Sequence, residues 1–428
     1  MTTIKIKYLW MTLLALMLAT PLTAQRPSAH KGKTPVAVRK KAQTLEQIFR
    51  VNDYWQKNHA PQATAFWNVA AYHTGNMEVC KWIQNELVTN KRLSADRRKL
   101  LTEKLNNYLA YSLQWAAHNN WKGATEPDTA KWLYKKYGED QQHVLFGDWQ
   151  ICFQTYIDLY NWYQNHQNQY APDAFKQVAS HPNIMTARAR EVMGYVVAHP
   201  AHDYWWWADA LYMVMPVMMK MYKLTGDVRY LDKLYDNISY SDSIMLDQET
   251  GLYFRDGKYI YPMHKTNNGK KDFWARGDGW VLAGLAKVLQ DMPTSYQHYD
   301  FFLKKYQRLA LAVAQLQQPE GYWTRSMMDP QQAPGPETSG TAFFTYGMEW
   351  GVNHQLLDAK TFLPVIRRAQ KYLTTVALQA DGSVGYVQPI GERAIPGQHV
   401  DKSSQADFGV GAYLLAAVES LRAPHRSK

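Results

Sequence analysis

The chain has 428 residues, of which 46% are hydrophobic, and this is enough for one large globular domain or two ordinary ones. The formal net charge of +11 lies at the two ends. Residues 1–45 carry eight Lys or Arg and no acid, and residues 422–428 carry three more, again with no acid. The chain between them is neutral overall, so no nucleic-acid groove is expected, and an acidic ligand would have to be recognised by individually placed arginines.

The first residues have the pattern of a secretory signal. Lys5 and Lys7 precede the apolar run LWMTLLALMLA, and the small-residue stretch TPLTAQ follows it. We expect cleavage after Ala24, so that the mature protein is periplasmic or secreted. The apolar run is short for a bilayer span, which leaves an uncleaved anchor as the less favoured alternative. Beyond export, no membrane contact is expected.

The rest of the chain is expected to form one domain. After the signal peptide at 1–24, residues 25–42 are polar and basic with scattered proline, which predicts a flexible leader. Residues 43–421 are expected to form a single catalytic domain, and residues 422–428 a basic tail.

The two cysteines, Cys80 and Cys152, exclude a disulfide scaffold, although an exported protein could form one bridge. Cys152 lies among large apolar residues in WQICF, so we expect a buried free thiol there. Whether the two cysteines pair is left open.

Long segments with apolar residues at helical spacing predict an all-α protein. Runs of alternating β-branched residues are few. The clearest helical segments are 101–119, 148–166, 219–239, 301–317 and 409–421.

Glycine-aromatic loops interrupt these helices at a regular interval. Gly251, Gly321 and Gly385 lie 70 and 64 residues apart, so each interval holds about two helices and one long loop. Helical hairpins around a common centre would direct these loops to a single cavity. We therefore favour a closed α/α toroid over an open solenoid, which would normally show shorter repeats and polar terminal caps.

The first candidate catalytic residue is Asp209, which follows three tryptophans in WWWAD. An ordinary acid in the first turn of a helix is the alternative. A carboxyl packed against indole rings loses hydration, so its pKa rises and it can act as a general acid near neutral pH. Tryptophans also offer flat faces on which sugar rings stack.

Asp148 is the second candidate, in FGDW at another expected helix start. An N-cap is the alternative reading. Two carboxyls at the starts of different inner helices, each beside a tryptophan, could face one bound sugar.

The segment FWARGDGW places a cation and an anion between Trp274 and Trp280. Asp278 is expected to cap a helix that begins near Gly279. Arg276 would then lie just outside the positive end of that helix, where a bound anion would stabilise it. Guanidinium suits a planar carboxylate, so we predict that Arg276 holds a ligand carboxylate, with an internal salt bridge as the alternative.

Two further residues complete the candidate binding site. Glu337 is delivered by a proline-rich loop, next to Thr338 and Ser339, either of which could cap the following helix. His202 lies in an aromatic loop, although a lone histidine is more often structural or solvated. The sequence lacks the usual metal, nucleotide and serine-hydrolase motifs.

Six motifs, in this order and spacing, resemble glycoside hydrolase family 105, the unsaturated rhamnogalacturonyl hydrolases and related unsaturated uronyl hydrolases. The resemblance covers residues 145–421 and extends more weakly from about residue 45. The motifs are WWADALYM, GLYFRDGKY, FWARGDGW, GLAKVL, ETSGTAFF and FGVGAYLLAAVE.

This resemblance implies an (α/α)6 barrel that removes the Δ4,5-unsaturated uronic acid left by a polysaccharide lyase, through hydration of its C4=C5 double bond and with no cofactor. It places Asp209 at the general acid/base position and Asp148 as the second active-site acid. Trp207 would line the sugar site. Arg276 and Trp280 would lie around the carboxylate and ring of the substrate.

Two positions depart from the family pattern. Many relatives have asparagine where this chain has Asp278, and some have histidine in the loop that here offers Arg255 and Asp256. A rhamnogalacturonan-type substrate is the default, and a galacturonyl or glucuronyl preference is left open, as is the oligomeric state. Three other functions remain: a β-glucuronidase acting on intact uronides, a sugar epimerase on a similar barrel, and a non-catalytic acidic-glycan binding protein.

Overall fold

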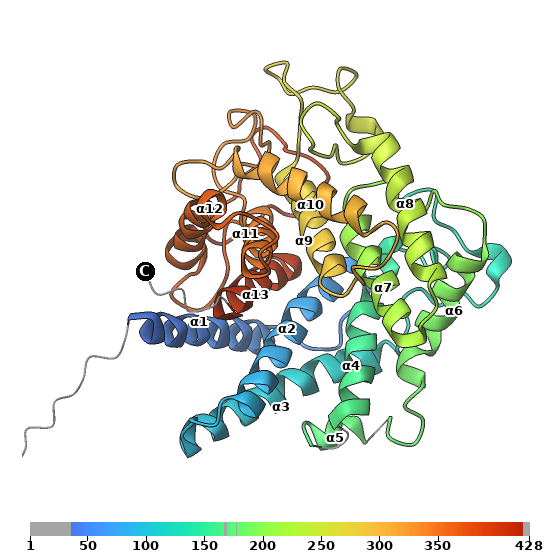
Figure 1. Cartoon of the computed structure of the whole chain (residues 1–428), viewed down its shortest axis with the longest axis vertical. Coiled ribbons are helices and arrows are strands. Elements are labelled where there is room, and N and C mark those ends of the chain that lie inside the picture. The colour runs from blue at the N-terminus through green and yellow to red at the C-terminus, as the bar shows by residue number, and fades with distance from the viewer. Residues whose placement is uncertain (1–35, 167–168, 177, 423–428) are drawn as a thin grey trace, which may run out of the picture.

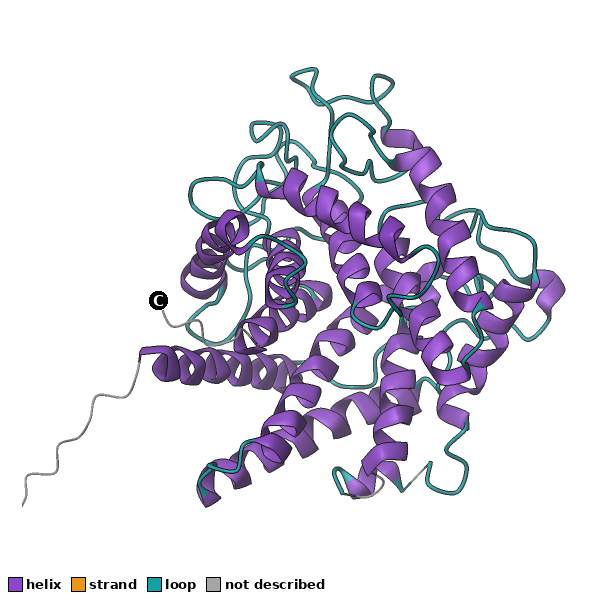
Figure 2. Ribbon diagram, viewed as in Figure 1, coloured by secondary structure: helices purple, strands orange, loops and turns teal. Residues whose placement is uncertain are grey.

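A computed structural model describes residues 36–166, 169–176 and 178–422. Within these residues the regular structure is helical, with isolated β-bridges between loops and no strand (Figure 2). The prediction of an all-α protein is confirmed. The predicted signal peptide lies outside the described residues.

Six helices form an inner ring. In chain order each contacts the next, and the last contacts the first (Figure 1). They are α2 (Trp67–Thr89), α4 (Cys152–His166), α7 (Ala210–Thr225), α9 (Ala275–Leu289), α11 (Thr338–Asn353) and α13 (Asp407–Arg422). Closure of this ring confirms the (α/α)6 barrel and excludes the open solenoid.

Six outer helices each pack mainly on one inner helix, and a short helix, α5 (Pro172–Phe175), follows α4. In the order of the inner helices, the outer partners are α3 (Ala95–His118), α6 (Ile184–Ala198), α8 (Arg229–Met245), α10 (Tyr299–Ala314), α12 (Ala359–Tyr372) and α1 (Val36–Asn58). Helix α1 begins at Val36, so the predicted leader at 25–42 extends too far into the chain. The segment VAVRKKAQTL continues directly into the helical pattern of α1.

The inner helices differ from the outer ones in how much of their surface is apolar. Nearly every residue of α9 and α11 is buried, whereas α12 buries one face through residues such as Phe362, Val365 and Ile366. This is the pattern expected when a helix is surrounded by others or packs on one side only. Glycine allows the ring to close, because a Cβ on Gly75 of α2 would lie 2.4 Å from the carbonyl oxygen of Gly411 in α13.

The long loops that precede α7, α9, α11 and α13 contact one another in turn at one end of the barrel, which we call the mouth. Isolated β-bridges join Trp207 to Asp256 and Trp274 to Ser326, and the backbone N–H of Thr338 donates to the carbonyl of Tyr386. The predicted convergence of the loops is therefore confirmed.

None of the helices in the described ranges is long and apolar enough to cross a membrane. Cys80 and Cys152 are both buried free thiols, as expected for Cys152.

Candidate active site

Asp209 immediately precedes α7, at its N-cap position, and faces the mouth. Its backbone is helical and, among the described residues, its side chain makes no capping hydrogen bond. The carboxyl is buried, and within the described part of the chain its Oδ2 has no hydrogen-bond partner. Burial raises the pKa of Asp209, and the nearby Arg255 and Arg276 guanidiniums partly oppose this rise. Asp209 is therefore not an ordinary capping acid.

Asp148 lies in a 3-10 turn, Gly147–Trp149, that precedes α4. It is buried, and its Oδ1 finds no partner among the residues described. Burial raises the pKa of Asp148 well above its usual value, and the negative charge of Asp209 adds to this effect. The two carboxyls therefore form an interacting pair in which simultaneous ionisation is disfavoured.

Glycine and tryptophan hold the turn that carries Asp148 against α7. A Cβ on Gly147 would lie 3.0 Å from a methyl of Val214 and 3.4 Å from the Trp207 ring. The Trp207 ring is buried and stacks on Phe146 at a centroid distance of 4.5 Å. Trp207 thus lies beside both predicted acids, in a packed rather than an open position.

Sequence reasoning assigned no role to Arg255, which it noted only as a departure from the family pattern. Its Nε lies 3.6 Å from Oδ2 of Asp209 and makes no hydrogen bond among the described residues. Its Nη1 donates to Asp256 at 2.5 Å and to Glu392 at 3.2 Å. Arg255 is therefore a cation with unused donor capacity beside the carboxyl pair.

Arg276 lies in the first turn of α9, fully buried, rather than outside the helix as predicted. Its Nη1 donates to the carbonyl of Gln388 at 2.7 Å and its Nη2 to the carbonyl of Pro389 at 2.9 Å. The guanidinium also lies 3.9 Å from Glu337 and packs over the Trp274 ring at 4.5 Å. These contacts favour the alternative role of Arg276, an internal partner of protein groups. The terminal nitrogens that a ligand carboxylate would need are already engaged.

Asp278 does not cap α9, so that prediction is wrong. The helix begins one turn earlier, at Ala275, with Trp274 at the N-cap position. Oδ1 of Asp278 instead accepts the backbone N–H of Tyr253 at 2.8 Å. Its Oδ2 has no partner within the described chain, and burial raises its pKa well above the usual range.

Glu337 is itself the N-cap of α11, a role predicted for its neighbours Thr338 or Ser339. Its carboxylate accepts hydrogen bonds from the backbone of Ser339, Gly340 and Gln388 and from the Ser339 hydroxyl. It is fully buried. The structure therefore uses Glu337 as a helix cap and a partner of Arg276 rather than as a group available to a ligand.

Of the other predicted binding residues, Trp274 and Trp280 are buried, whereas His202 is exposed. Trp274 is buried, and its indole N–H donates to the side chain of Gln388 at 2.8 Å. Trp280 lies inside the barrel, packed on Tyr212 and Phe343. His202 is exposed and contacts Tyr240 edge-on, outside the carboxyl pair.

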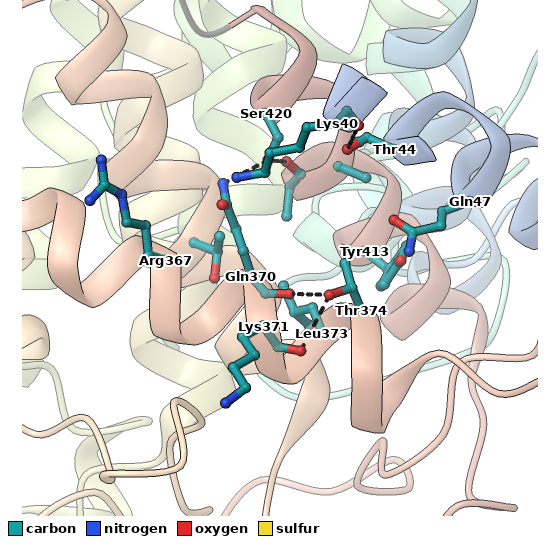
Figure 3. Close-up of a pocket in the computed structure, with 13 residues that line it drawn as sticks. Lys40, Thr44, Gln47, Arg367, Gln370, Lys371, Leu373, Thr374, Tyr413 and Ser420 are labelled. Carbon is teal, nitrogen blue, oxygen red and sulfur yellow. Dashed lines mark hydrogen bonds between the residues drawn. The ribbon is translucent and has the colours of Figure 1, made fainter. Parts of the chain in front are cut away.

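A cavity of about 290 Å³ lies elsewhere, between α1, α12 and α13 (Figure 3). Lys40, Arg367, Gln370, Lys371 and Tyr413 are among the residues that line it. It contains none of the predicted site residues. In the described ranges, no group of three or more His, Cys, Asp or Glu side chains is arranged to hold a metal ion.

A closed α/α barrel with two interacting buried carboxyls at its mouth fits a glycoside hydrolase, a class of enzyme that uses a pair of Asp or Glu residues. Residues 40–424 match the model of "Glycosyl Hydrolase Family 88", so the chain belongs to this glycoside hydrolase family. The resemblance drawn from the six sequence motifs is confirmed.

Three similar proteins illustrate the relationship. A solved structure described as "Glycosyl hydrolase family 88 from Bacteroides vulgatus" is 50% identical, covers 89% of this chain and 99% of its own, and has a TM-score of 0.78. A second, described as a polysaccharide lyase, is 55% identical, covers 90% and 98%, and has a TM-score of 0.77. The "Unsaturated 3S-rhamnoglycuronyl hydrolase" of Formosa agariphila is 36% identical over 222 residues, which is 51% of this chain and 58% of that protein. The chain thus spans little more than half the length of this curated relative.

Proposed function

We propose that the protein releases Δ4,5-unsaturated uronic acid from the non-reducing end of lyase-generated oligosaccharides. The observation that carries this proposal is the group formed by Asp148, Asp209 and Arg255. Burial raises the pKa values of both carboxyls, which favours the protonated form that a general acid needs. The unused Nε of Arg255 beside them suits an anionic substrate.

In the proposed reaction, Asp209 transfers its proton to C4 of the substrate. Water adds at C5, and the Asp209 carboxylate accepts the proton that the water loses. The hemiketal at C5 then opens to a ketone, and the hemiacetal left at C1 releases the aglycone. The reaction consumes one water and restores the proton on Asp209.

Arg255 would couple substrate binding to the protonation of Asp209. In the free protein its charge lowers the pKa of Asp209 and opposes the effect of burial. A substrate carboxylate bound to the Nε of Arg255 would offset that charge, so the pKa of Asp209 would rise further. The protonated form of Asp209, which the reaction requires, is then favoured when the substrate is in place.

The substrate class is a finer part of the proposal. The name of the Formosa agariphila relative supports an unsaturated uronyl group linked to rhamnose, and a rhamnogalacturonan or pectin fragment is the default substrate. Lyase elimination removes the stereocentre at C4, at which glucuronic and galacturonic acids differ. Discrimination between these sources must therefore rest on the glycosidic linkage and the aglycone.

Mass spectrometry on an unsaturated disaccharide would test the reaction type. The proposal predicts that the summed mass of the two products exceeds the substrate mass by one water and that the double bond disappears. A lyase, the activity in the description of one similar structure, would instead create a double bond without adding water. Release of uronic acid from a saturated β-glucuronide as fast as from the unsaturated one would select the intact-uronide alternative, and an isomer of unchanged mass would select the epimerase.

We also propose that the mature protein is exported, on the pattern of residues 1–24. N-terminal sequencing of the protein recovered outside the cytoplasm should begin at Gln25. Recovery of the chain with its original N-terminus, fixed in the membrane, would contradict this.

A further inference from the structure

A cavity of about 500 Å³ lies at the mouth beside the carboxyl pair. Residues from three loops and from α8 line it, including Tyr134, Lys135, Asp203, Trp206 and Tyr240. None of the predicted catalytic or binding residues is among its lining residues, so its function is not accounted for by the carboxyl pair itself.

The cavity shares its wall with the proposed catalytic group. Trp206, which lines it, precedes Trp207, and the two rings lie 4.6 Å apart. Asp256 also lines it and accepts a hydrogen bond from Arg255. A sugar chain leaving the carboxyl pair at this side would therefore enter the cavity.

The aromatic side chains of the cavity are held in place by hydrogen bonds. The indole N–H of Trp206 donates to the carbonyl of Tyr134 at 2.9 Å, and the Tyr134 hydroxyl donates to Asp203 at 2.6 Å. Trp206 and Tyr240 are only partly buried, so their rings are accessible. Accessible aromatic faces next to a few polar groups are typical of a ligand site.

The charges at the rim are asymmetric. Lys258 pairs with Glu392 at 2.9 Å and lies 3.8 Å from Asp256. Lys135, by contrast, has no carboxylate partner among the described residues, and its ammonium lies 5.9 Å from the centre of the Tyr134 ring. Lys135 is therefore an exposed cation available to a ligand anion.

We propose that this cavity is the aglycone subsite, in which a sugar packs on Trp206 and Tyr240 and Lys135 binds an anionic group, sulfate or carboxylate, on that sugar. The inference rests on the proposed function. It identifies the residues that would contact the aglycone, on which discrimination between substrates must depend.

The test compares kcat/KM for substrates that share the unsaturated uronyl group and differ in the aglycone: methyl, neutral rhamnosyl, sulfated rhamnosyl and a uronic acid. Replacing Lys135→Ala should lower kcat/KM for the two anionic aglycones about threefold to tenfold relative to the neutral rhamnosyl one. Added salt should shrink this difference. The sulfated and carboxylated substrates separate the two sources of the anion.

Lys136→Ala is the matched control, because Lys136 is an exposed neighbour that does not line the cavity, and it should leave all ratios unchanged. Tyr240→Ala tests the aromatic wall and should disfavour every glycosyl aglycone relative to methyl. Equal effects of Lys135→Ala on all four substrates, together with no effect of Tyr240→Ala, would overturn the subsite. Lack of turnover of every substrate by the unaltered protein would instead refute the proposed function.

Discussion

Two buried carboxyls toward the far end of the inner helical ring and two at its mouth differ in their partners. At the far end, Asp158 of α4 accepts hydrogen bonds from Lys81 and Lys220, and Glu78 of α2 pairs with Lys81 at 2.9 Å and with Arg422 at 2.7 Å. These cations outweigh the effect of burial and lower the pKa values of both acids.

At the mouth, burial raises the pKa values of Asp148 and Asp209, and each has an oxygen that finds no partner among the described residues. The same helices supply both ends, since α4 carries Asp158 and α7 carries Lys220. Burial alone therefore does not distinguish the ends. The far-end acids accept hydrogen bonds from lysine or arginine, whereas Arg255 lies 3.6 Å from Asp209 without donating a hydrogen bond to it. An unpaired buried acid costs stability, and such groups are typical of functional sites.

The largest expected effect is at the mouth. Asp209→Asn removes the transferable proton and should lower kcat about 10²- to 10⁴-fold while the helical circular dichroism stays unchanged. Glu320→Gln, at an exposed loop acid, is the control and should retain full activity. Normal turnover by Asp209→Asn would contradict the assignment of Asp209 as the proton donor.

Substitutions at the far end should lower the stability of the protein and leave its catalytic rate unchanged. Asp158→Ala leaves Lys81 and Lys220 without a shared anion, so the free energy of unfolding should fall by about 3–5 kcal/mol in denaturant titrations. The folded variant should keep its kcat. Asp173→Ala removes a fully exposed ion pair with Lys176 and should have no measurable effect; equal losses for the two variants would contradict the account.

The two arginines at the mouth offer a sharper contrast. Arg255→Ala should raise KM about tenfold to a hundredfold, because it removes the proposed contact to the substrate carboxylate. Arg276→Ala should chiefly lower the melting temperature, since it leaves the buried carbonyls of Gln388 and Pro389 without donors. Steady-state kinetics and thermal melts on both variants would check this. A raised KM for Arg276→Ala and an unchanged KM for Arg255→Ala would instead make Arg276 the ligand-binding residue.

The smallest expected effect concerns Asp278. Its raised pKa means that the folded state binds a proton that the unfolded chain releases, so this residue makes stability fall as pH rises from about 4 toward its folded-state pKa. Asp278→Asn keeps an acceptor for the N–H of Tyr253 and should flatten this dependence, with a gain of about 1 kcal/mol at alkaline pH. Melting temperatures across the pH range would show it, and parallel curves for the two proteins would refute it.

Much of the fold was predictable because its signals are local. Apolar spacing gave the helices, and the glycine-aromatic loops indicated the closed ring. Asp148 and Asp209 were identifiable because tryptophans adjoin them in sequence, although only the structure shows that the two carboxyls interact.

The errors arose where distant segments decide the structure. Arg276 is held by carbonyls more than a hundred residues away, and Arg255 is positioned partly by Glu392. The start of α9 was misplaced because its glycines were read as a loop. In the structure Gly277 and Gly279 are helical and give room for Trp274 and Phe343, whose atoms would lie 3.1 and 3.2 Å from an added Cβ.

The most direct test of the central claim is the ultraviolet absorbance of the enol acid over time, with residues 25–428 and unsaturated oligosaccharides from pectin, glycosaminoglycan and arabinogalactan digests. The account predicts loss of absorbance with at least one substrate and almost none with Asp209→Asn. Constant absorbance across the whole panel with folded protein, or an increase with intact polysaccharide, would contradict it.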